Sequence, residues 1–276
     1  MVFRAESSVT VIVPTFNSEK FLKKCLLSIR NQTYKNVEVI VIDNNSTDKT
    51  REIASGYCKT ISFIGSRSAA RNKGASCARG DFILSIDSDM ELKSNVIDDC
   101  LAQVENGFAA VIIPEISVGE GFWAKCRALE KSCYIGDDLV ETPRFFRKNV
   151  IETIGGYDSR LEAGEDWDLC ERIKSKGFRI GRINSFLLHN EGKLSLRNAF
   201  SKKHYYGKTI RLYQKKHPVK ARKQLIIIRP CFIKKWRLLA NQPVNALGLF
   251  FLKTCEFAAG WLGSINGNSQ TIYPEN

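Results

Sequence analysis

The sequence predicts an α/β fold in which helices cover both faces of a mostly parallel β-sheet. The alternation of two kinds of segment along the chain supports this fold class. Short apolar runs that end in turn residues alternate with segments whose apolar residues recur every three or four positions. This alternation favours a parallel sheet, because parallel neighbours need a crossover connection that a helix supplies. The 276 residues are enough for one large domain with an appendage.

The first half of the chain contains the predicted strands. Apolar runs with the length of a buried strand lie at residues 9–13, 37–42, 61–64, 82–86 and 108–113. Segments with helical spacing follow them, starting near Ser18 and Thr47 and covering residues 69–78 and 94–106. Further along, the region around Pro143 shows no regular pattern, and acids at 165–168 open another helix.

Positive charge is concentrated near the end of the chain. The net charge is +13, yet residues 192–255 contain 16 Lys or Arg and no Asp or Glu. The rest of the chain carries 26 of the 42 basic side chains against 29 acidic ones, so the N-terminal body is slightly acidic. We therefore expect an α/β domain over residues 1–195 and a basic, partly apolar helical region over residues 196–276.

The C-terminal region combines cations, aromatic rings and long apolar segments. Residues 244–265 are strongly apolar, but Asn245, Lys253 and Glu256 within them argue against a transmembrane helix. One helical stripe holds Leu247, Phe250, Phe251, Thr254, Ala258 and Trp261, with Lys253 and Glu256 off it. We expect amphipathic helices that lie in the membrane interface and are attracted to anionic lipid. The alternative is a set of helices packed on the body with a basic, solvated face.

Cysteine usage and the N-terminus indicate the compartment. The nine cysteines are scattered, are odd in number and form no C-x-x-C pair, so most read as small buried hydrophobes. The apolar run 9–13 is too short for a signal peptide or an anchor. We therefore expect a cytoplasmic protein that is peripheral on the cytosolic face of the membrane.

Polar side chains follow three of the predicted strands. Thr15 comes after the first, Asp43 after the second, and Asp87 and Asp89 after the run 82–86. The carboxyl ends of parallel strands meet at one edge of a sheet, where open α/β folds bind ligands. Two carboxylates there suit a divalent cation, Mg²⁺ or Mn²⁺, that holds a diphosphate. A solvated loop or a helix cap is the simpler explanation of such an isolated triplet.

Several motifs together carry a resemblance to a known family. They are Val11–Asn17, Val41–Asp48, Ala70–Gly74, Arg79–Asp81, Asp87–Asp89 and Gly164–Asp168. In this order and spacing they resemble glycosyltransferase family 2, inverting enzymes of the Rossmann-like GT-A fold. The resemblance covers roughly residues 8–195. It implies that residues 1–195 form a nucleotide-sugar-binding catalytic domain. More loosely, the end of the chain is similar to members that act on lipid-linked acceptors.

The resemblance implies roles on the donor side of the site. Pro14, Thr15 and Phe16 would line the base pocket, and Phe16 would offer its ring to the nucleobase, although a core Phe is a rival interpretation. Asp43 would accept the ring N–H of uracil or a similar base. Arg71 would reach the base or the diphosphate, and an ordinary surface arginine is the alternative.

The resemblance also implies metal ligands and a base. Asp87 would lie near the ribose and the metal, Asp89 would ligate Mg²⁺ or Mn²⁺, and His189 would complete the metal shell, although a structural His is common after a strand. An inverting transfer needs a base opposite the leaving group. The resemblance assigns this role to Asp166, with Glu165 in reserve; residue chemistry alone does not separate the two neighbours.

The resemblance as a whole implies a metal-dependent inverting glycosyltransferase. It would move a sugar from a nucleotide-sugar donor, with UDP-sugar favoured, to a lipid-linked or membrane-proximal glycan acceptor. A GDP- or dTDP-sugar donor with a soluble acceptor is one alternative, and a catalytically silent scaffold is another. A third is a basic protein that binds nucleic acid, but the long apolar tail argues against nucleic acid as a partner.

Overall fold

The structure is a computed structural model that describes residues 7–266, and its chain divides into two compact units. Unit 1 takes in the residues up to 114 together with 142–159 and 166–189. Unit 2 takes in residues 115–141, 160–165 and those from 190 onward. The division differs from the expected one after residue 195, because two earlier segments group with the C-terminal helices.

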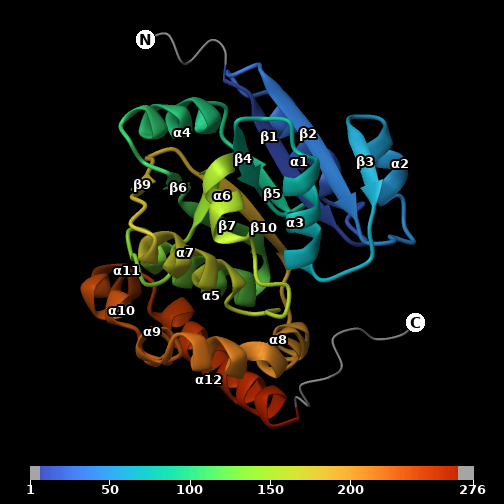
Figure 1. Ribbon diagram of the computed structural model, residues 1–276. Helices are drawn as coiled ribbons and strands as arrows, with labels where there is room; N and C mark the ends of the chain where they lie inside the picture. The colour runs from blue at the N-terminus through green and yellow to red at the C-terminus, as the bar shows by residue number, and fades with distance from the viewer. Residues whose placement is uncertain (1–6, 267–276) are drawn as a thin grey trace. The chain divides into compact units, whose positions relative to one another are not determined.

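A seven-stranded sheet forms the centre of unit 1, in the order β3-β2-β1-β4-β8-β6-β9 (Figure 1). Its strands are β1 Val9–Thr15, β2 Val37–Asp43, β3 Lys59–Ser62, β4 Phe82–Ser85, β6 Ala110–Ile112, β8 Pro143–Arg147 and β9 Ile180–Arg182. The pairs β1–β2, β1–β4, β2–β3 and β6–β9 are parallel, and only β8 runs antiparallel to its neighbours in this sheet of the described chain. The predicted α/β fold with a mostly parallel sheet is confirmed.

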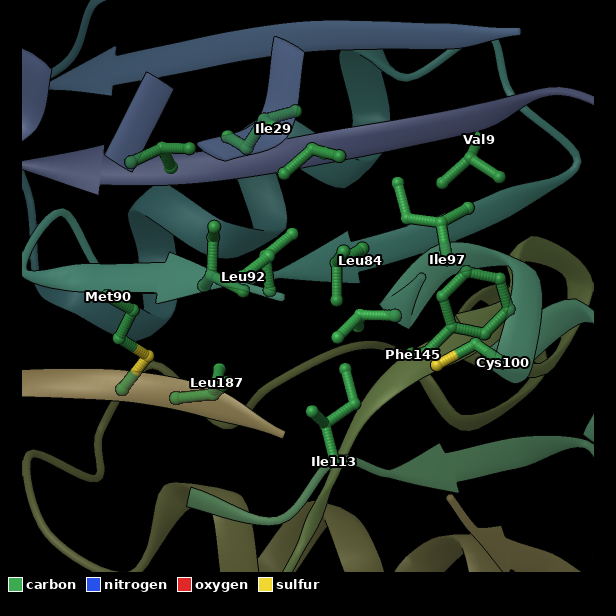
Figure 2. Close-up of a cluster of buried hydrophobic side chains, with 14 of the residues drawn as sticks. Val9, Ile29, Leu84, Met90, Leu92, Ile97, Cys100, Ile113, Phe145 and Leu187 are labelled. Atoms are coloured by element: carbon green, nitrogen blue, oxygen red, sulfur yellow. The ribbon is translucent and has the colours of Figure 1, made fainter. Parts of the chain in front are cut away.

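Helices cover both faces of this sheet. They are α1 Leu22–Arg30, α2 Thr50–Ser55, α3 Arg67–Cys77, α4 Val96–Glu105, α6 Lys148–Ile154 and α7 Glu165–Ser175. Successive side chains of a strand point to opposite faces of the sheet, so β1 contributes side chains to two hydrophobic cores. Val11 belongs to the first core and Ile12 to the second. The first core includes side chains of α1 and α4, and Figure 2 shows Val9, Leu84 and Phe145 within it. The second includes side chains of α3, α6 and α7.

Strands β5, β8 and β9 of unit 1 were not expected from the sequence. Strand β8 lies in the region that reads as irregular, because Arg144 and Arg147 interrupt its apolar pattern. Strand β5, Met90–Leu92, follows the Asp87–Asp89 triplet and pairs antiparallel with the start of β10, Leu187–Lys193. In this register His189 lies opposite Met90.

Unit 2 is mainly helical. Its elements are β7 Glu115–Glu120, α5 Gly121–Tyr134, α8 Leu196–Lys216, α9 Pro218–Gln224, α10 Pro230–Lys234, α11 Trp236–Ala240 and α12 Pro243–Asn266. Helices α8 and α12 pack closely against each other, and α12 also packs on α5 (Figure 1). Glycines allow the close approach of α8 and α12: a Cβ at Gly207 would overlap the carbonyl oxygen of Gly260, and one at Gly263 would overlap that of His204.

A buried cluster of charges joins α5 and α12 within unit 2. Arg127 forms ion pairs with Glu130 and Glu256, and Lys253 Nζ lies 2.8 Å from Glu130 Oε1. The hydroxyl of Tyr134 donates to Glu130 as well. Glu130 and Glu256 have side chains that are only 2% and 5% exposed. Burial alone would raise the pKa of Glu130, but Lys253 and Arg127 hold it well below its usual range, so the carboxylate is ionised.

Among the helices of residues 7–266, none is both long enough and apolar enough to cross a membrane.

Candidate functional site

The carboxyl ends of β1 and β2 bring Thr15 and Asp43 together. The two residues are partners in the parallel register, and Thr15 Oγ1 donates to Asp43 Oδ1 at 3.0 Å. The backbone N–H of Ser46 donates to Asp43 Oδ2 at 3.1 Å, and its hydroxyl donates to Oδ1. Asp43 is fully buried. A carboxylate accepts about four hydrogen bonds, so Asp43 keeps acceptor capacity beyond these three.

Hydrogen bonds join the loops that follow β1 and β2. The N–H of Asn17 donates to Ser46 Oγ at 2.9 Å, and the N–H of Thr47 donates to Asn17 Oδ1 at 2.9 Å. The N–H of Ser18 donates to Thr50 Oγ1 at 2.6 Å. Asn17 has a φ of 47°, a left-handed conformation that asparagine tolerates better than most residues. The two loops are therefore held in one arrangement by their own side chains.

Phe16 lies at the start of this loop pair and points outward. It is 62% exposed, which contradicts the rival interpretation of a core phenylalanine. Thr15, which precedes it, is buried, and Pro14 is half-buried. An exposed ring beside the end of a parallel strand offers a face on which a flat base can stack.

Arg71 is buried at the centre of the site, on helix α3. Its Nη2 lies 2.8 Å from Asp87 Oδ1, its Nη1 lies 3.1 Å from Asp166 Oδ1, and its guanidinium stacks over the Tyr157 ring at 5.2 Å. The helix lies close to the sheet because Gly74 has no Cβ to collide with a β1 side chain. With a side chain only 1% exposed, Arg71 is not the surface arginine of the alternative interpretation.

Asp87 faces positive charge on two sides. Besides Arg71, Arg144 on β8 lies 3.7 Å from Asp87 Oδ2. Burial alone would raise the pKa of Asp87, but the guanidinium groups of Arg71, Arg67 and Arg144 hold it well below its usual range. Asp87 is therefore ionised at neutral pH. Arg144 was missed from the sequence, because the two phenylalanines that follow it are too short an apolar run to indicate a strand.

Asp89 and His189 form a pair next to Asp87. His189 Nε2 lies 3.3 Å from Asp89 Oδ2, and the β5–β10 pairing brings the two residues together. Asp89 Oδ1 is buried and has no hydrogen-bond partner in the described part of the chain. A carboxylate oxygen without a donor, beside an imidazole, fits a divalent cation. Within residues 7–266 no three His, Cys, Asp or Glu side chains form a ligand group.

The two acids at the start of α7 differ in burial. Glu165 is 4% exposed, whereas the Asp166 side chain is 32% exposed. Asp166 contacts Arg71 through Oδ1 only, and Oδ2 forms no ion pair with the described residues. Asp168 is buried and pairs with Arg172 at 2.8 Å, and Arg172 also donates to the carbonyls of Ile154 and Gly156. The third acid of the motif thus holds a turn in place, and Asp166 is the accessible one.

Within unit 1 the structure therefore brings together most of the predicted site residues. Arg71, Asp87 and Asp166 form one ion-paired group, and Asp89 with His189 forms the adjacent pair. Thr15 and Asp43 form a separate polar group at the neighbouring strand ends. The site therefore contains several carboxylates. Arg71 pairs with two of them, Asp87 and Asp166, and Asp166 remains accessible.

Comparison with curated proteins finds relatives of this chain among glycosyltransferases. The chain is 32% identical over 200 residues to the GalNAc(5)-diNAcBac-PP-undecaprenol beta-1,3-glucosyltransferase of Campylobacter jejuni, covering 63% of this chain and 64% of that protein. The chain spans less than two thirds of the length of the curated relatives it matches.

Solved structures share the fold. The mannosyltransferase of Pyrobaculum calidifontis, in complex with GDP-Man and Mn²⁺, superposes with a TM-score of 0.63 at 18% identity, covering 95% of this chain and 87% of that one. Residues 1–349 of S. aureus TarS, in complex with UDP-GlcNAc, superpose with a TM-score of 0.58 at 19% identity, covering 95% and 89%. The family model of glycosyl transferase family 2 matches residues 10–157, more than half of the sequence. The chain therefore belongs to glycosyl transferase family 2.

Proposed function

We propose that this protein transfers a sugar, with inversion, from a nucleotide-sugar donor to a hydroxyl of a lipid-linked or membrane-proximal glycan. One observation carries the proposal: Asp166, an accessible carboxylate, is fixed by Arg71 beside the Asp87 and Asp89 turn. This arrangement provides a base on one side and a place for a leaving diphosphate on the other. The fold shared with proteins that bind UDP-GlcNAc and GDP-Man supports a nucleotide-sugar donor.

The donor's base would lie at the ends of β1 and β2. Phe16 offers an exposed ring for stacking, and Thr15 with Asp43 offers polar groups at the same edge. We propose a UDP-sugar, since Asp43 can accept a ring N–H of uracil and the S. aureus structure contains UDP-GlcNAc. The GDP-Man of the Pyrobaculum structure supports the alternative donor class.

Asp89 and His189 would hold a divalent metal, Mg²⁺ or Mn²⁺, together with phosphate oxygens of the donor. The orphaned Oδ1 of Asp89 and the adjacent imidazole are the donor set that supports this role. When bound, the metal supplies positive charge at the leaving diphosphate. Asp87 forms ion pairs with Arg71 and Arg144, and it keeps these two guanidinium groups beside its own carboxylate.

Asp166 would act as the general base. Its Oδ1 is held by Arg71, so Oδ2 is the atom that would take the proton of the acceptor hydroxyl as that hydroxyl attacks. Arg71 is a positioning residue in this scheme, since its guanidinium joins the base to the acid of the donor side. The burial of Glu165 supports the choice of Asp166 over its neighbour.

The acceptor and the location complete the proposal. The Campylobacter relative is named for a polyprenol-linked substrate, which supports a lipid-linked acceptor here. The basic segment 192–255 supports an anionic membrane surface as a partner, on the cytosolic face.

A nucleotide screen combined with two variants tests the proposal. We expect UDP with Mn²⁺ to raise the thermal midpoint of the wild type, because a ligand that binds only the folded state stabilises it. Asp89→Ala should lose the metal-dependent shift. Asp166→Asn should keep the shift but lose turnover by roughly 10²–10⁴-fold, the usual contribution of a general base.

Asp99→Asn on α4 is the matched control, since it removes the charge of an acid outside the site. It should leave both the shift and the turnover unchanged. Turnover by Asp166→Asn at the wild-type rate would show that another group is the base. A shift with GDP and not with UDP would move the proposal to the alternative donor.

A further inference from the structure

Helix α12 has an apolar exposed face. Its exposed positions include a series that recurs every three or four residues, namely Val244, Leu247, Phe251, Thr254, Ala258, Trp261 and Ile265. Leu247 is 75% exposed, Phe251 is 54% exposed and Trp261 is 60% exposed. We call these seven residues the α12 face. It contains no charged side chain over its whole length.

The charged side chains of α12 lie on the side of the helix that packs against α5. Lys253 and Glu256 are the acidic or basic residues of this helix, and both pair with α5 in the buried cluster around Arg127 and Glu130. A water-exposed helix normally places its charges outside and its apolar residues inside. The outer side of α12 departs from this pattern, because large apolar side chains are exposed there while the two charged residues of the helix are held in ion pairs on the inner side.

The preceding helices of unit 2 show a related surface. On α10 and α11, Ile233, Trp236 and Leu238 are exposed, at 69%, 59% and 38%. The cations Lys234 and Arg237 alternate with them and are exposed too. Helix α11 packs against α12 and leads directly into it. The result, within unit 2, is exposed apolar side chains accompanied by cations and by no acid from residue 192 to 255.

We propose that the α12 face, with the exposed side chains of α10 and α11, docks on a bilayer that contains anionic lipid. The helix would lie in the interface, with its apolar side chains among the acyl chains and the nearby cations at the headgroups. This inference rests on the proposed function, since it places the protein where a lipid-linked acceptor is found. It goes further by naming the docking face and the lipid class.

The positive charge near the α12 face, together with its apolar side chains, favours a bilayer over other binding partners. A second copy of the chain would bring two strongly basic segments together, and like charges oppose such a contact. A nucleic acid would satisfy the cations but gives no reason to expose Leu247, Phe251 and Trp261. An anionic bilayer satisfies both the cations and the apolar side chains.

Sedimentation with vesicles tests the docking face in the full chain. The vesicles are phosphatidylcholine alone, or phosphatidylcholine with phosphatidylglycerol at about three to one. We expect the wild type to sediment with the anionic vesicles and roughly tenfold less with the neutral ones, because each Lys or Arg near an anionic surface adds to binding. The triple variant Leu247→Ser, Phe251→Ser, Trp261→Ser should lower the partition coefficient on anionic vesicles by about tenfold or more.

The matched control is Ile64→Ser, which removes an apolar side chain 77% exposed in unit 1. It should sediment as the wild type does. The triple variant keeps the net charge, so its loss of binding reports on the apolar face alone. Retention of the UDP and Mn²⁺ thermal shift in the triple variant shows that it is folded and separates this test from that of the proposed function.

Three results would overturn the inference. The first is a wild type that stays in the supernatant with both kinds of vesicle. The second is a triple variant that sediments as well as the wild type does. The third, from sedimentation velocity, is a wild-type dimer that the triple variant converts to a monomer, since a second copy would then cover the face.

Discussion

Each unit of the molecule contains a buried arginine between two carboxylates, and the two arrangements differ in the exposure of the acids. In unit 1 the partners of Arg71, Asp87 and Asp166, have side chains 20% and 32% exposed. In unit 2 the partners of Arg127, Glu130 and Glu256, are 2% and 5% exposed. The same ionic chemistry therefore leaves accessible acids at the candidate site of unit 1, and it links two helices through covered acids in unit 2.

Removal of Arg127 should have the largest effect on stability. Arg127→Met leaves Glu130 with Lys253 and leaves Glu256 without its guanidinium partner in a buried place. Breaking a buried ion pair from one side typically costs about 3–5 kcal/mol, and we expect a loss of that size in the free energy of unfolding. Urea unfolding followed by circular dichroism measures it.

The double variant Arg127→Met, Glu256→Met sharpens this test. It removes the stranded carboxylate, so it should recover part of the lost stability. A single variant that loses less than about 1 kcal/mol, the usual value of an exposed pair, would show that the cluster is solvated.

Removal of Arg71 should affect turnover more than stability. In Arg71→Met the two acids can still be hydrated, so we expect a loss of about 1–3 kcal/mol in unfolding free energy, less than for Arg127→Met. Turnover should fall by roughly 10²-fold or more, because Asp166 is no longer held. Arg71→Lys keeps the charge without the two-pronged geometry and should be intermediate in turnover. A larger stability loss for Arg71→Met than for Arg127→Met would contradict the comparison.

The glycine contact in unit 2 offers a smaller, purely steric test. Gly207→Ala places a Cβ against the carbonyl of Gly260, so α8 and α12 must separate. Overpacking of this kind costs about 1–3 kcal/mol. The control is Gly56→Ala at the end of α2, where a Cβ would meet no atom closer than 3.6 Å and φ is −73°. Thermal unfolding should show a lower midpoint for Gly207→Ala and no loss for Gly56→Ala.

Lowering the pH should reveal the smallest of the predicted changes in stability. The pKa of Asp87 is held below its ordinary value of 3.8 by the arginines around it, so below about pH 4 the unfolded chain binds a proton that the folded chain does not. This contribution to stability is complete above that pH and is lost as the pH falls further. Between pH 6 and pH 3 the urea midpoint of Asp87→Asn should therefore fall less than that of the wild type, by the equivalent of about 1 kcal/mol. Equal slopes would show that Asp87 has an ordinary pKa in the folded protein.

The sequence was informative about strands and strand ends. Continuous apolar runs predicted β1, β2 and β4, because strands buried on both faces have no polar side. The placement of Thr15, Asp43 and Asp87 at one edge of the sheet followed from parallel topology. The family was recognisable partly for the same reason, since three of its motifs, Val11–Asn17, Val41–Asp48 and Asp87–Asp89, lie at these strand ends.

Pairings between distant residues could not be read from local patterns. Arg71 and Asp166 are 95 residues apart, and nothing near Arg71 distinguishes a buried arginine from a surface one. The stripe of α12 was predictable from its period, but the partners of Lys253 and Glu256 on α5 are more than 120 residues away. The roles of the individual site residues stay predictions until the variants are measured.

The hydrogen bonds between the loops after β1 and β2 have a consequence for the kinetics of binding. Ser46 and Thr50 hold the backbone N–H groups of Asn17 and Ser18, and Thr47 holds the side chain of Asn17, so the entropy of ordering these loops is lost during folding. A nucleotide that stacks on Phe16 would not have to order them again. We therefore expect its association to be a single fast phase whose rate rises linearly with nucleotide concentration, with no slower rearrangement behind it.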